Sequence, residues 1–412
     1  MKPAESSVVG QSDAGPTPDS ELIPHCPTST SVVQNCDHGI ILNAISSWDS
    51  DTLLSPTLSS KDSSASGVFH IEGRTNGTTP PPLALPVRCE REIGILLGHQ
   101  LGQGAYGRVY SCTSSYSMEP TKEFVVKVLN VSPWTSCPEM ITPHAILAEA
   151  VLSKSLIHKN IVTTYDYAFV QRASWSNLPV VEMWILQEKA DMGTLYDGIR
   201  AGLFKDNLSA VVFTALDIAR GIRHLHEVAG VIHADLSGNN ILLKTADTAT
   251  TDAEDEIKDK RGFNAVICDL GLSTMTKAFD LSSGPPPFQT CALNKPLGTV
   301  THLAPELLVF SSTTHPSTKG VAGAFQPSKP QDIYGFGVLL WELFNNQLAW
   351  KGYNSSQIIF SVGWLGQTLD DGLQEQAPCP PELRQLVKDC MHANPDARPT
   401  ISSIIETLLR HI

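Results

Sequence analysis

Hydrophobic positions along the chain change their spacing near residue 92. Residues 1–86 are rich in Ser, Thr, Pro and Gly and contain few aromatic side chains. Such a stretch buries too little apolar surface to offset the entropy lost on ordering. We therefore predict that residues 1–91 are a disordered Ser/Thr/Pro-rich N-terminal region, with the apolar "GIILNAI" (residues 39–45) as a candidate short docking helix.

From residue 92 onward the pattern predicts strands first and helices later. The segments "IGILLGHQLGQGAYGRVYSCTSS" and "EFVVKVLNV" are apolar runs joined by glycine turns, which is typical of β-strands. "HAILAEAVLSKSL" has the apolar spacing of a helix. After "DMGTL", helical spacing dominates in "LSAVVFTALDIARGIRHLHEVA", "DIYGFGVLLWELF", "ELRQLVKDCMHA" and "ISSIIETLLRHI".

This order predicts an α+β fold with two lobes in one domain, residues 92–412. A small β-rich N-lobe with one main helix spans about residues 92–187, a hinge about 188–193, and a larger helical C-lobe about 194–412. Two polar stretches, the acidic residues 245–260 and residues 311–330, read as loop insertions.

Composition narrows the class of protein. The formal net charge of −13 argues against nonspecific binding to nucleic acid or anionic membranes, which needs clustered Lys and Arg. The nine cysteines are scattered without C-x-x-C spacing, as expected for reduced thiols. We find no signal peptide and no apolar run that approaches the roughly 20 residues of a membrane span. We therefore expect a cytoplasmic protein, and its oligomeric state is open.

The segment "LGQGAYGRV" places Gly102, Gly104, Gly107 and Val109 in the order G-x-G-x-x-G-x-V. Glycines in such a loop let the backbone approach phosphate groups, with N–H groups free to donate. Taken alone, the pattern fits an ordinary glycine-rich hairpin equally well. A dinucleotide-binding fold would begin a helix directly after the third glycine, whereas "RVYSCTSS" continues as a strand.

Five further positions carry candidate chemistry. Lys127 lies in an apolar strand, where an unpaired ammonium is costly, and Glu149 on the following helix is a natural partner. "VIHADLSGNNILL" places Asp235 and Asn240 between two short strands, and "AVICDLGLST" places Asp269 at the end of another. One Asp and one Asn are a suitable ligand set for Mg²⁺ that also contacts phosphate oxygens.

Together with "GTVTHLAPE", "DIYGFGVLLWEL" and "NPDARPT", these motifs resemble eukaryotic-type protein kinases. Within them the lettering is similar to the tyrosine-kinase-like Ser/Thr group, in the branch abundant in plants and green algae. The resemblance covers the chain from about residue 94 to the end. It implies ATP and Mg²⁺, with Lys127 and Glu149 positioning phosphates, Asp235 as base, and Asn240 and Asp269 as metal ligands.

The resemblance also implies the remaining site residues. Gln187 would be the gatekeeper, Glu188 C=O and Ala190 N–H would face adenine, and Thr299 would lie on the substrate side beside Asp235. Glu306–Arg398 and Asp332 would be structural. The implied ATP-binding set is Leu101, Gly102, Gly104, Gly107, Val109, Val125, Lys127, Gln187, Glu188, Ala190 and Leu242.

Several residues depart from the family pattern. Ala234 replaces the Arg before the catalytic Asp, and Ser237 replaces the Lys that neutralises the transferring phosphoryl group. Val125 replaces a smaller Ala, and Ser153 replaces a large apolar residue on the helix of Glu149. Cys268, next to Asp269, is expected at the back of the ATP pocket, where an electrophile would modify it and ATP would protect it.

Two functions fit these residues. The first is a Ser/Thr kinase that transfers the ATP γ-phosphoryl group to protein hydroxyls in intracellular signalling; loss of one electrostatic stabiliser costs on the order of 10²–10³ in rate, not all activity. The alternative is a pseudokinase scaffold that keeps the fold and nucleotide binding. A small-molecule phosphotransferase of similar fold is disfavoured by the A-P-E segment, residues 304–306.

Overall fold

The computed structural model describes residues 67–71, 83–104, 107–114, 123–131, 143–172, 180–246, 259–275, 298–308, 327–369 and 379–412. Residues 1–66, with the candidate docking helix at 39–45, lie outside these ranges, as does most of both predicted loop insertions.

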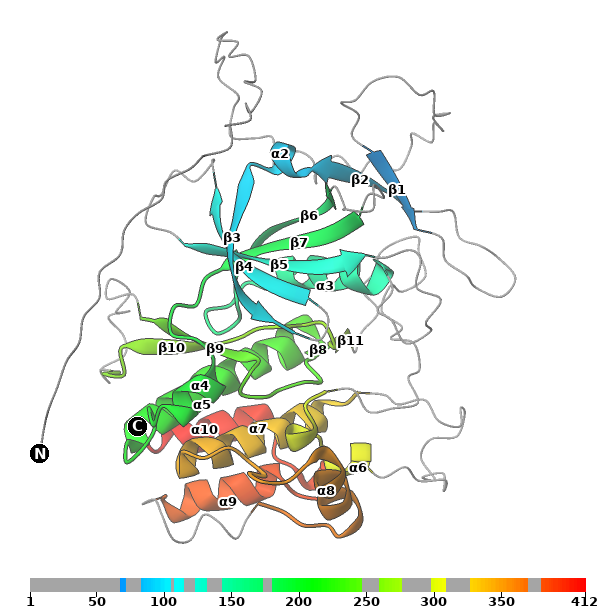
Figure 1. The fold of residues 1–412 in the computed structure, drawn as a ribbon. Coiled ribbons are helices and arrows are strands. Elements are labelled where there is room, and N and C mark those ends of the chain that lie inside the picture. Colours follow the sequence, from blue (N-terminus) through cyan, green and yellow to red (C-terminus); the bar gives the residue numbers. More distant parts are fainter. Residues whose placement is uncertain are drawn as a thin grey trace, which may run out of the picture. The chain divides into compact units, whose positions relative to one another are not determined.

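Seven strands form one sheet in the N-terminal part of the described chain (Figure 1). Their order is β1-β2-β6-β7-β5-β4-β3, and all neighbours are antiparallel except β2 and β6. The strands are β1 (Gly67–Ile71), β2 (Leu83–Cys89), β3 (Ile95–Gln103), β4 (Gly107–Ser114), β5 (Phe124–Val131), β6 (Thr164–Arg172) and β7 (Val180–Glu188).

The sheet begins earlier than the predicted boundary at residue 92. β2 pairs with β6 in parallel, with Val87 opposite Phe169, and both side chains are buried. The short helix α2 (Glu90–Ile93) then leads into β3. The segment "LALPVRC" contains a proline and its partner strand comes much later in the sequence, so local patterning did not reveal it. Residues 83–91 belong to the folded domain.

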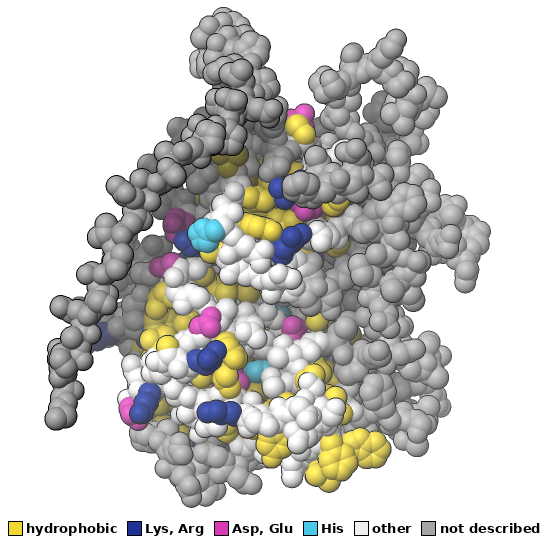
Figure 2. All heavy atoms as spheres, viewed as in Figure 1, with side chains coloured by type: hydrophobic (Ala, Val, Ile, Leu, Met, Phe, Trp, Pro, Cys, Tyr) yellow, Lys and Arg dark blue, Asp and Glu magenta, His cyan; other side chains and the backbone are white. Residues whose placement is uncertain are grey.

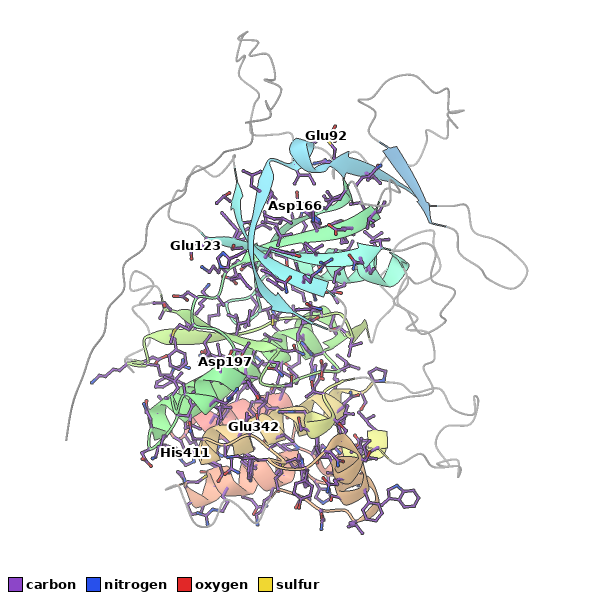
Figure 3. All side chains as sticks on the ribbon, in the orientation of Figure 1. Glu92, Glu123, Asp166, Asp197, Glu342 and His411 are labelled. Carbon is purple, nitrogen blue, oxygen red and sulfur yellow. The ribbon has the colours of Figure 1, made fainter. Side chains whose placement is uncertain are left out.

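One helix packs on the sheet, as predicted for the smaller lobe. α3 (Pro143–Ser155) places Ile146 and Ala150 against buried side chains of β2, β5, β6 and β7. The other face of the sheet carries a separate apolar cluster that includes Val126, Val128 and Trp184. At its end, α3 is held to β6 because Lys154 Nζ lies 2.7 Å from Asp166 Oδ1; Asp166 is labelled in Figure 3.

The rest of the described chain is mainly helical and shares one large apolar core. α4 (Leu195–Arg200) begins with a capping box in which Thr194 Oγ1 accepts from Asp197 N, and Asp197 is labelled at this helix in Figure 3. The other elements are α5 (Leu208–Arg223), a π-helical turn η1 (His224–Ala229), η2 (Val300–His302), α6 (Pro305–Leu308), α7 (Lys329–Asn345), α8 (Ser355–Ile358), a second π-helical turn η3 (Ile359–Trp364), α9 (Pro381–Cys390), η5 (Pro395–Ala397) and α10 (Ile401–Leu409).

α7 lies at the centre of these helices, and nearly all of its residues are buried. α5 and α9 pack on it, and α10 packs on both of those. Figure 2 shows a group of exposed hydrophobic side chains near α8 and η3, where Phe360, Trp364 and Leu365 are each more than half exposed. Within the described ranges, no helix is long and apolar enough to cross a bilayer.

Four short strands carry the loops between the sheet and the helices. β8 (Val231–Ile232) pairs with β11 (Thr274–Met275), and β9 (Ile241–Thr245) pairs with β10 (Phe263–Ile267). A bridge between Ile161 and Ile267 joins the chain just before β6 to β10. These contacts place the loops after β8 and β10 next to the sheet.

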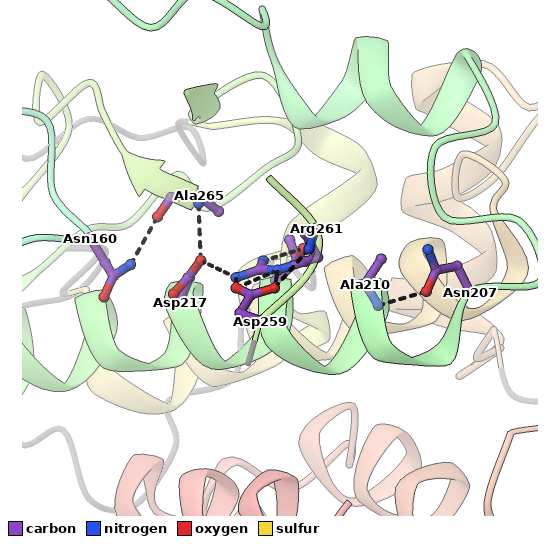
Figure 4. A network of polar contacts seen from close by, with 8 residues as sticks. Asn160, Asn207, Ala210, Asp217, Asp259, Arg261 and Ala265 are labelled. Atoms are coloured by element: carbon purple, nitrogen blue, oxygen red, sulfur yellow. Dashed lines mark hydrogen bonds and ion pairs between the residues drawn. The ribbon is translucent and has the colours of Figure 1, made fainter. Parts of the chain in front are cut away.

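A buried arginine anchors the chain just before β10 (Figure 4). Arg261 donates to Asp217 and Thr214 of α5 and to Asp259, while its guanidinium lies over the Phe213 ring. Its side chain is only 3% exposed. The chain that leads into β10 is therefore fixed to α5 directly after the predicted acidic insertion at residues 245–260.

Candidate active site

Lys127 in the middle of β5 joins two carboxylates from distant parts of the chain. Its Nζ lies 2.6 Å from Glu149 Oε1 on α3 and 2.8 Å from Asp269 Oδ1 after β10. Burial alone would lower the pKa of Lys127, but the two carboxylates outweigh it and raise that pKa above its usual value. The ammonium is therefore charged, and it links the sheet to the segment after β10.

Asp269 has a left-handed backbone, with φ of 62°, and its carboxylate remains partly open. Burial favours its neutral form, yet the charge and hydrogen bond of Lys127 and the Gly271 N–H hold the pKa of Asp269 below its usual value. The adjacent Leu270 is buried in the helical core. An ionised carboxylate thus stands between the sheet and the helices, anchored by the side chain that follows it.

Asp332 of α7 braces the loop after β8 from below. It accepts hydrogen bonds from His233 N at 2.8 Å, Ala234 N at 2.9 Å and His226 Nε2 at 2.7 Å. Ala234 adopts φ of 68°, which is unfavourable for a residue with a Cβ. The backbone turn that presents Asp235 is therefore maintained by a buried carboxylate, as the resemblance implied.

Asp235 is oriented through both of its carboxylate oxygens. Thr299 N donates to Oδ1 at 2.7 Å, and Asn240 Nδ2 donates to Oδ2 at 2.9 Å and to the Asp235 carbonyl at 2.8 Å. Thr299 Oγ1 also lies 3.3 Å from Ser237 Oγ. These bonds bring Asp235, Asn240 and Thr299 together and fix the direction of the Asp235 carboxylate. A fixed direction is what a group that accepts a proton would need.

The residues expected at magnesium fit that role chemically. The Asn240 amide donates through its nitrogen to Asp235, which leaves its oxygen as the available acceptor. Asp269 Oδ1 is engaged by Lys127, which leaves the second carboxylate oxygen for a cation. One carboxylate oxygen and one amide oxygen match the preference of Mg²⁺ for a few hard ligands completed by phosphate and water.

The expected adenine-site residues are neighbours in the sheet register. Val109 lies opposite Lys127, and Val125 lies opposite Gln187. Leu242 bridges to Thr194 just beyond the hinge. Leu101 is exposed and Val125 is buried. The predicted upper and lower walls of the pocket therefore come from adjacent strands and from β9.

The hinge after β7 is held in place by hydrogen bonds to residues that no sequence motif marked. Gln187 Nε2 donates to Thr164 Oγ1 at 3.0 Å. The Glu188 carboxylate accepts hydrogen bonds from Thr163 N and Lys244 Nζ. Thr164 carries no motif that would have marked it. Within the described ranges, no acceptor bonds the Ala190 N–H, which leaves it available to a ligand.

The glycine loop is described except for residues 105–106. Gly104 N donates to Gly107 O at 2.9 Å, which closes the turn between β3 and β4. A Cβ at Gly107 would meet Leu129 Cδ2 at 2.6 Å and Val128 O at 2.7 Å, whereas one at Gly102 would meet open space. Gly107 therefore has a packing requirement beside β5 in addition to any ligand requirement.

A small cavity beside Asp235 is lined by residues that include Ala234, Thr299, His302 and Gln331, with no lysine or arginine. Gln331 Nε2 donates to Ala234 O at 3.1 Å, a contact that no sequence signal indicated. Among the described residues that line this cavity with Ala234, none is a cation that could replace the family's Arg.

Two further expectations concern structural residues. Arg398 and Glu306 form a bidentate pair with N–O distances of 2.8 and 2.7 Å, as the resemblance implied. Ser153 is buried on α3, where a larger apolar residue is usual, yet Glu149 one turn earlier still reaches Lys127.

Comparison with known proteins gives a consistent picture. The family model described as "Protein kinase domain" matches residues 96–409. A probable serine/threonine-protein kinase of Dictyostelium discoideum is 27% identical over 229 residues, which cover 55% of this chain and 13% of that protein. A serine/threonine/tyrosine-protein kinase of Arabidopsis thaliana is 26% identical over 318 residues, 77% of this chain and 66% of that protein. The chain thus spans only part of the length of these curated relatives.

Proposed function

Because the chain belongs to the protein kinase family, we propose that it is an active serine/threonine kinase that uses ATP and Mg²⁺. The observation that carries the proposal is the contact of Lys127 with Glu149 and Asp269, next to an Asp235 whose carboxylate is already oriented. All five side chains that bind phosphate, accept the proton or ligate metal in this family are present.

In the proposed mechanism, Lys127 holds the α- and β-phosphates, and Glu149 keeps its ammonium in place. Asp235 accepts the proton from the serine or threonine hydroxyl as that oxygen bonds to the γ-phosphorus, the bond from this phosphorus to the β–γ bridging oxygen breaks, and ADP leaves. Bound Mg²⁺ would neutralise the phosphate charge from Asn240 and Asp269. Thr299 beside Asp235 would receive the acceptor side chain, which favours Ser and Thr as acceptors.

The second candidate is a pseudokinase scaffold. It is favoured by Ser237, which stands where the family has a Lys and whose hydroxyl is hydrogen-bonded to Thr299 Oγ1. Loss of one such stabilising cation lowers the rate by a factor of about 10²–10³. If the protein is an active kinase, we therefore expect slow but measurable phosphoryl transfer. If the protein is an active kinase, we also predict that its substrates are proteins and that it is located in the cytoplasm.

The test is phosphorylation of a generic substrate protein with radiolabelled ATP and Mg²⁺. We expect activity from the wild-type chain and from Lys351→Met, an exposed lysine outside the site. Lys127→Met should lose activity because the phosphates are misplaced, and Asp235→Asn because the base is removed. If either of these variants matches the wild type, the active-site assignment is wrong. Binding of ATP without transfer in the wild type would favour the pseudokinase.

A further inference from the structure

A group of basic side chains lies where the loop after α3 crosses α5. The His158 and His224 rings stack, with centroids 4.8 Å apart and planes inclined by 27°. The crossing is close, because a Cβ on Gly221 of α5 would meet Asn160 O at 2.8 Å. Arg220 precedes His224 by one helical turn, Arg223 is adjacent to it, and Lys159 follows His158. We call His158, Lys159, Arg220, Arg223 and His224 the basic patch.

The positive charge of the basic patch is not neutralised. Burial, followed by the charges of His224, Lys159, Arg223 and Arg220, lowers the pKa of His158 to about 4. Among the described residues, no carboxylate forms an ion pair with Lys159, Arg220 or Arg223. Four basic neighbours therefore lower the pKa of His158, and no carboxylate is among the groups that shift it. This local excess of positive groups contrasts with the net charge of −13 of the whole chain.

Along α5, Asp217 lies three residues before Arg220, but it is buried and paired with Arg261. The acidic residue that follows the basic patch in η1 is Glu227. It lies one turn beyond Arg223 and is exposed, and its Oε1 accepts a hydrogen bond from Ser402 Oγ at 3.0 Å. Its carboxylate is thus directed in part to α10. It would weaken anion binding at the basic patch without removing the excess of positive groups.

The hydrogen-bond donors of the basic patch suit a phosphate. Asn160 N donates to His158 Nδ1 at 3.1 Å, so the neutral His158 ring carries its proton on Nε2 and can donate there. Two arginines bring planar forks of N–H groups, the geometry that phosphate oxygens accept best. Beside these donors, Ile157 is 85% exposed and Val228, one turn beyond His224, is 73% exposed.

We propose that the basic patch binds a phosphorylated serine or threonine within a peptide segment of a partner protein. The phosphate contacts Arg220, Arg223, Lys159 and His158, and apolar neighbours of the phosphorylated residue cover Ile157 and Val228. A peptide fits better than nucleic acid or a membrane because the charge is local, and a net charge of −13 repels an extended polyanion. None of the five residues belongs to the catalytic set, so the site is separate from substrate turnover.

The probe is a short fluorescein-labelled peptide with a central phosphoserine and a leucine on either side, measured by fluorescence anisotropy. The protein is the full chain with Asp235→Asn, and excess ATP and Mg²⁺ are present so that the peptide is not read as an active-site ligand. We expect Arg220→Gln/Arg223→Gln to weaken binding at least tenfold, which is about 1.4 kcal/mol. The control Lys205→Gln/Lys351→Gln removes the same charge from exposed positions elsewhere and should stay within about twofold.

Three results would overturn the proposal: equal binding of the unphosphorylated peptide, unchanged affinity in the double arginine variant, or an equal loss in the control. The protein could instead bind vesicles that contain phosphatidylserine and not the peptide. If that vesicle binding is lost in Arg220→Gln/Arg223→Gln, the surface is a membrane-binding site. Thermal denaturation checks that Arg220→Gln/Arg223→Gln is folded. Should it not fold, Lys159→Gln, an exposed loop substitution, must weaken the phosphopeptide in the same direction.

Discussion

Replacing Asp332 by Asn tests whether the buried carboxylate holds the loop that carries Asp235, the proposed catalytic base. Asp332 is 1% exposed and accepts three hydrogen bonds, from His226 Nε2 and from the N–H groups of His233 and Ala234. An Asn side chain offers one oxygen, so its amide N–H₂ must face at least one of these donors. The substitution conserves size and removes the charge and one acceptor.

The magnitude follows from those contacts. Hydrogen bonds to a charged group contribute about 1.5–3 kcal/mol each, and a buried donor left without an acceptor costs about 1–3 kcal/mol. Breaking a buried ionic arrangement of this kind is expected to lower the free energy of unfolding by about 3–5 kcal/mol. Ala234, at φ of 68°, stores about 1–2 kcal/mol of backbone strain that the remaining bonds must hold. The loop should relax there, and Asp235 should move with it.

The assay is urea denaturation together with kcat on a generic substrate. We expect Asp332→Asn to lose stability and to lose kcat by more than the unfolded fraction explains. Asp206→Asn is the matched control, because Asp206 is exposed and Asn tolerates its φ of 55°. If the free energy of unfolding of Asp332→Asn lies within about 0.5 kcal/mol of the wild type, as for surface substitutions, the bracing role is refuted.

Two further predictions concern the departures at the site. In kinases that carry an Arg at the position of Ala234, that Arg receives a phosphate on the segment that here lies between Ser273 and Thr299. Because Ala234 lacks the cation, complete phosphatase treatment should change the initial rate by less than about tenfold, or 1.4 kcal/mol. A larger fall, with phosphate loss from that segment verified by mass spectrometry, would mean that another basic residue has taken over. Burial, and after it the charge of Asp269, raises the pKa of Cys268 to about 12. Labelling of Cys268 by a nucleotide-site electrophile should therefore be slow, and its rate should increase with pH as more of the thiolate forms. Equal labelling with and without saturating ATP, or a rate independent of pH from 7 to 9, would contradict this placement of the thiol.

The family and the two-lobed α+β architecture could be predicted because motifs and periodicity are local. The apolar spacing of "HAILAEAVLSKSL" is that of α3, and the long apolar runs later in the chain are those of α5, α7 and α10. Lys127 and Glu149 could be paired because an isolated charge in an apolar strand requires a partner. In each case, the physical requirement is visible within a few residues of sequence.

The contacts that were not predicted are tertiary. Thr164 is bonded to Gln187 and Gln331 to Ala234, yet neither Thr164 nor Gln331 differs locally from an ordinary polar residue. β2 was missed because its strand depends on β6, which no short window of sequence includes. The basic patch likewise forms only when the loop after α3 crosses α5 at Gly221.

The anchoring of the chain around Arg261 has a consequence for how this protein can be altered. Ala246 N donates to Gly262 O, and Arg261 fixes the chain before β10 to α5, so the described residues on either side of 247–258 lie next to each other. Closing a loop whose ends are already adjacent costs only about 0.6 kcal/mol more for each doubling of its length. An epitope or reporter inserted at this junction is therefore expected to cost little stability and to leave the proposed catalytic residues in place.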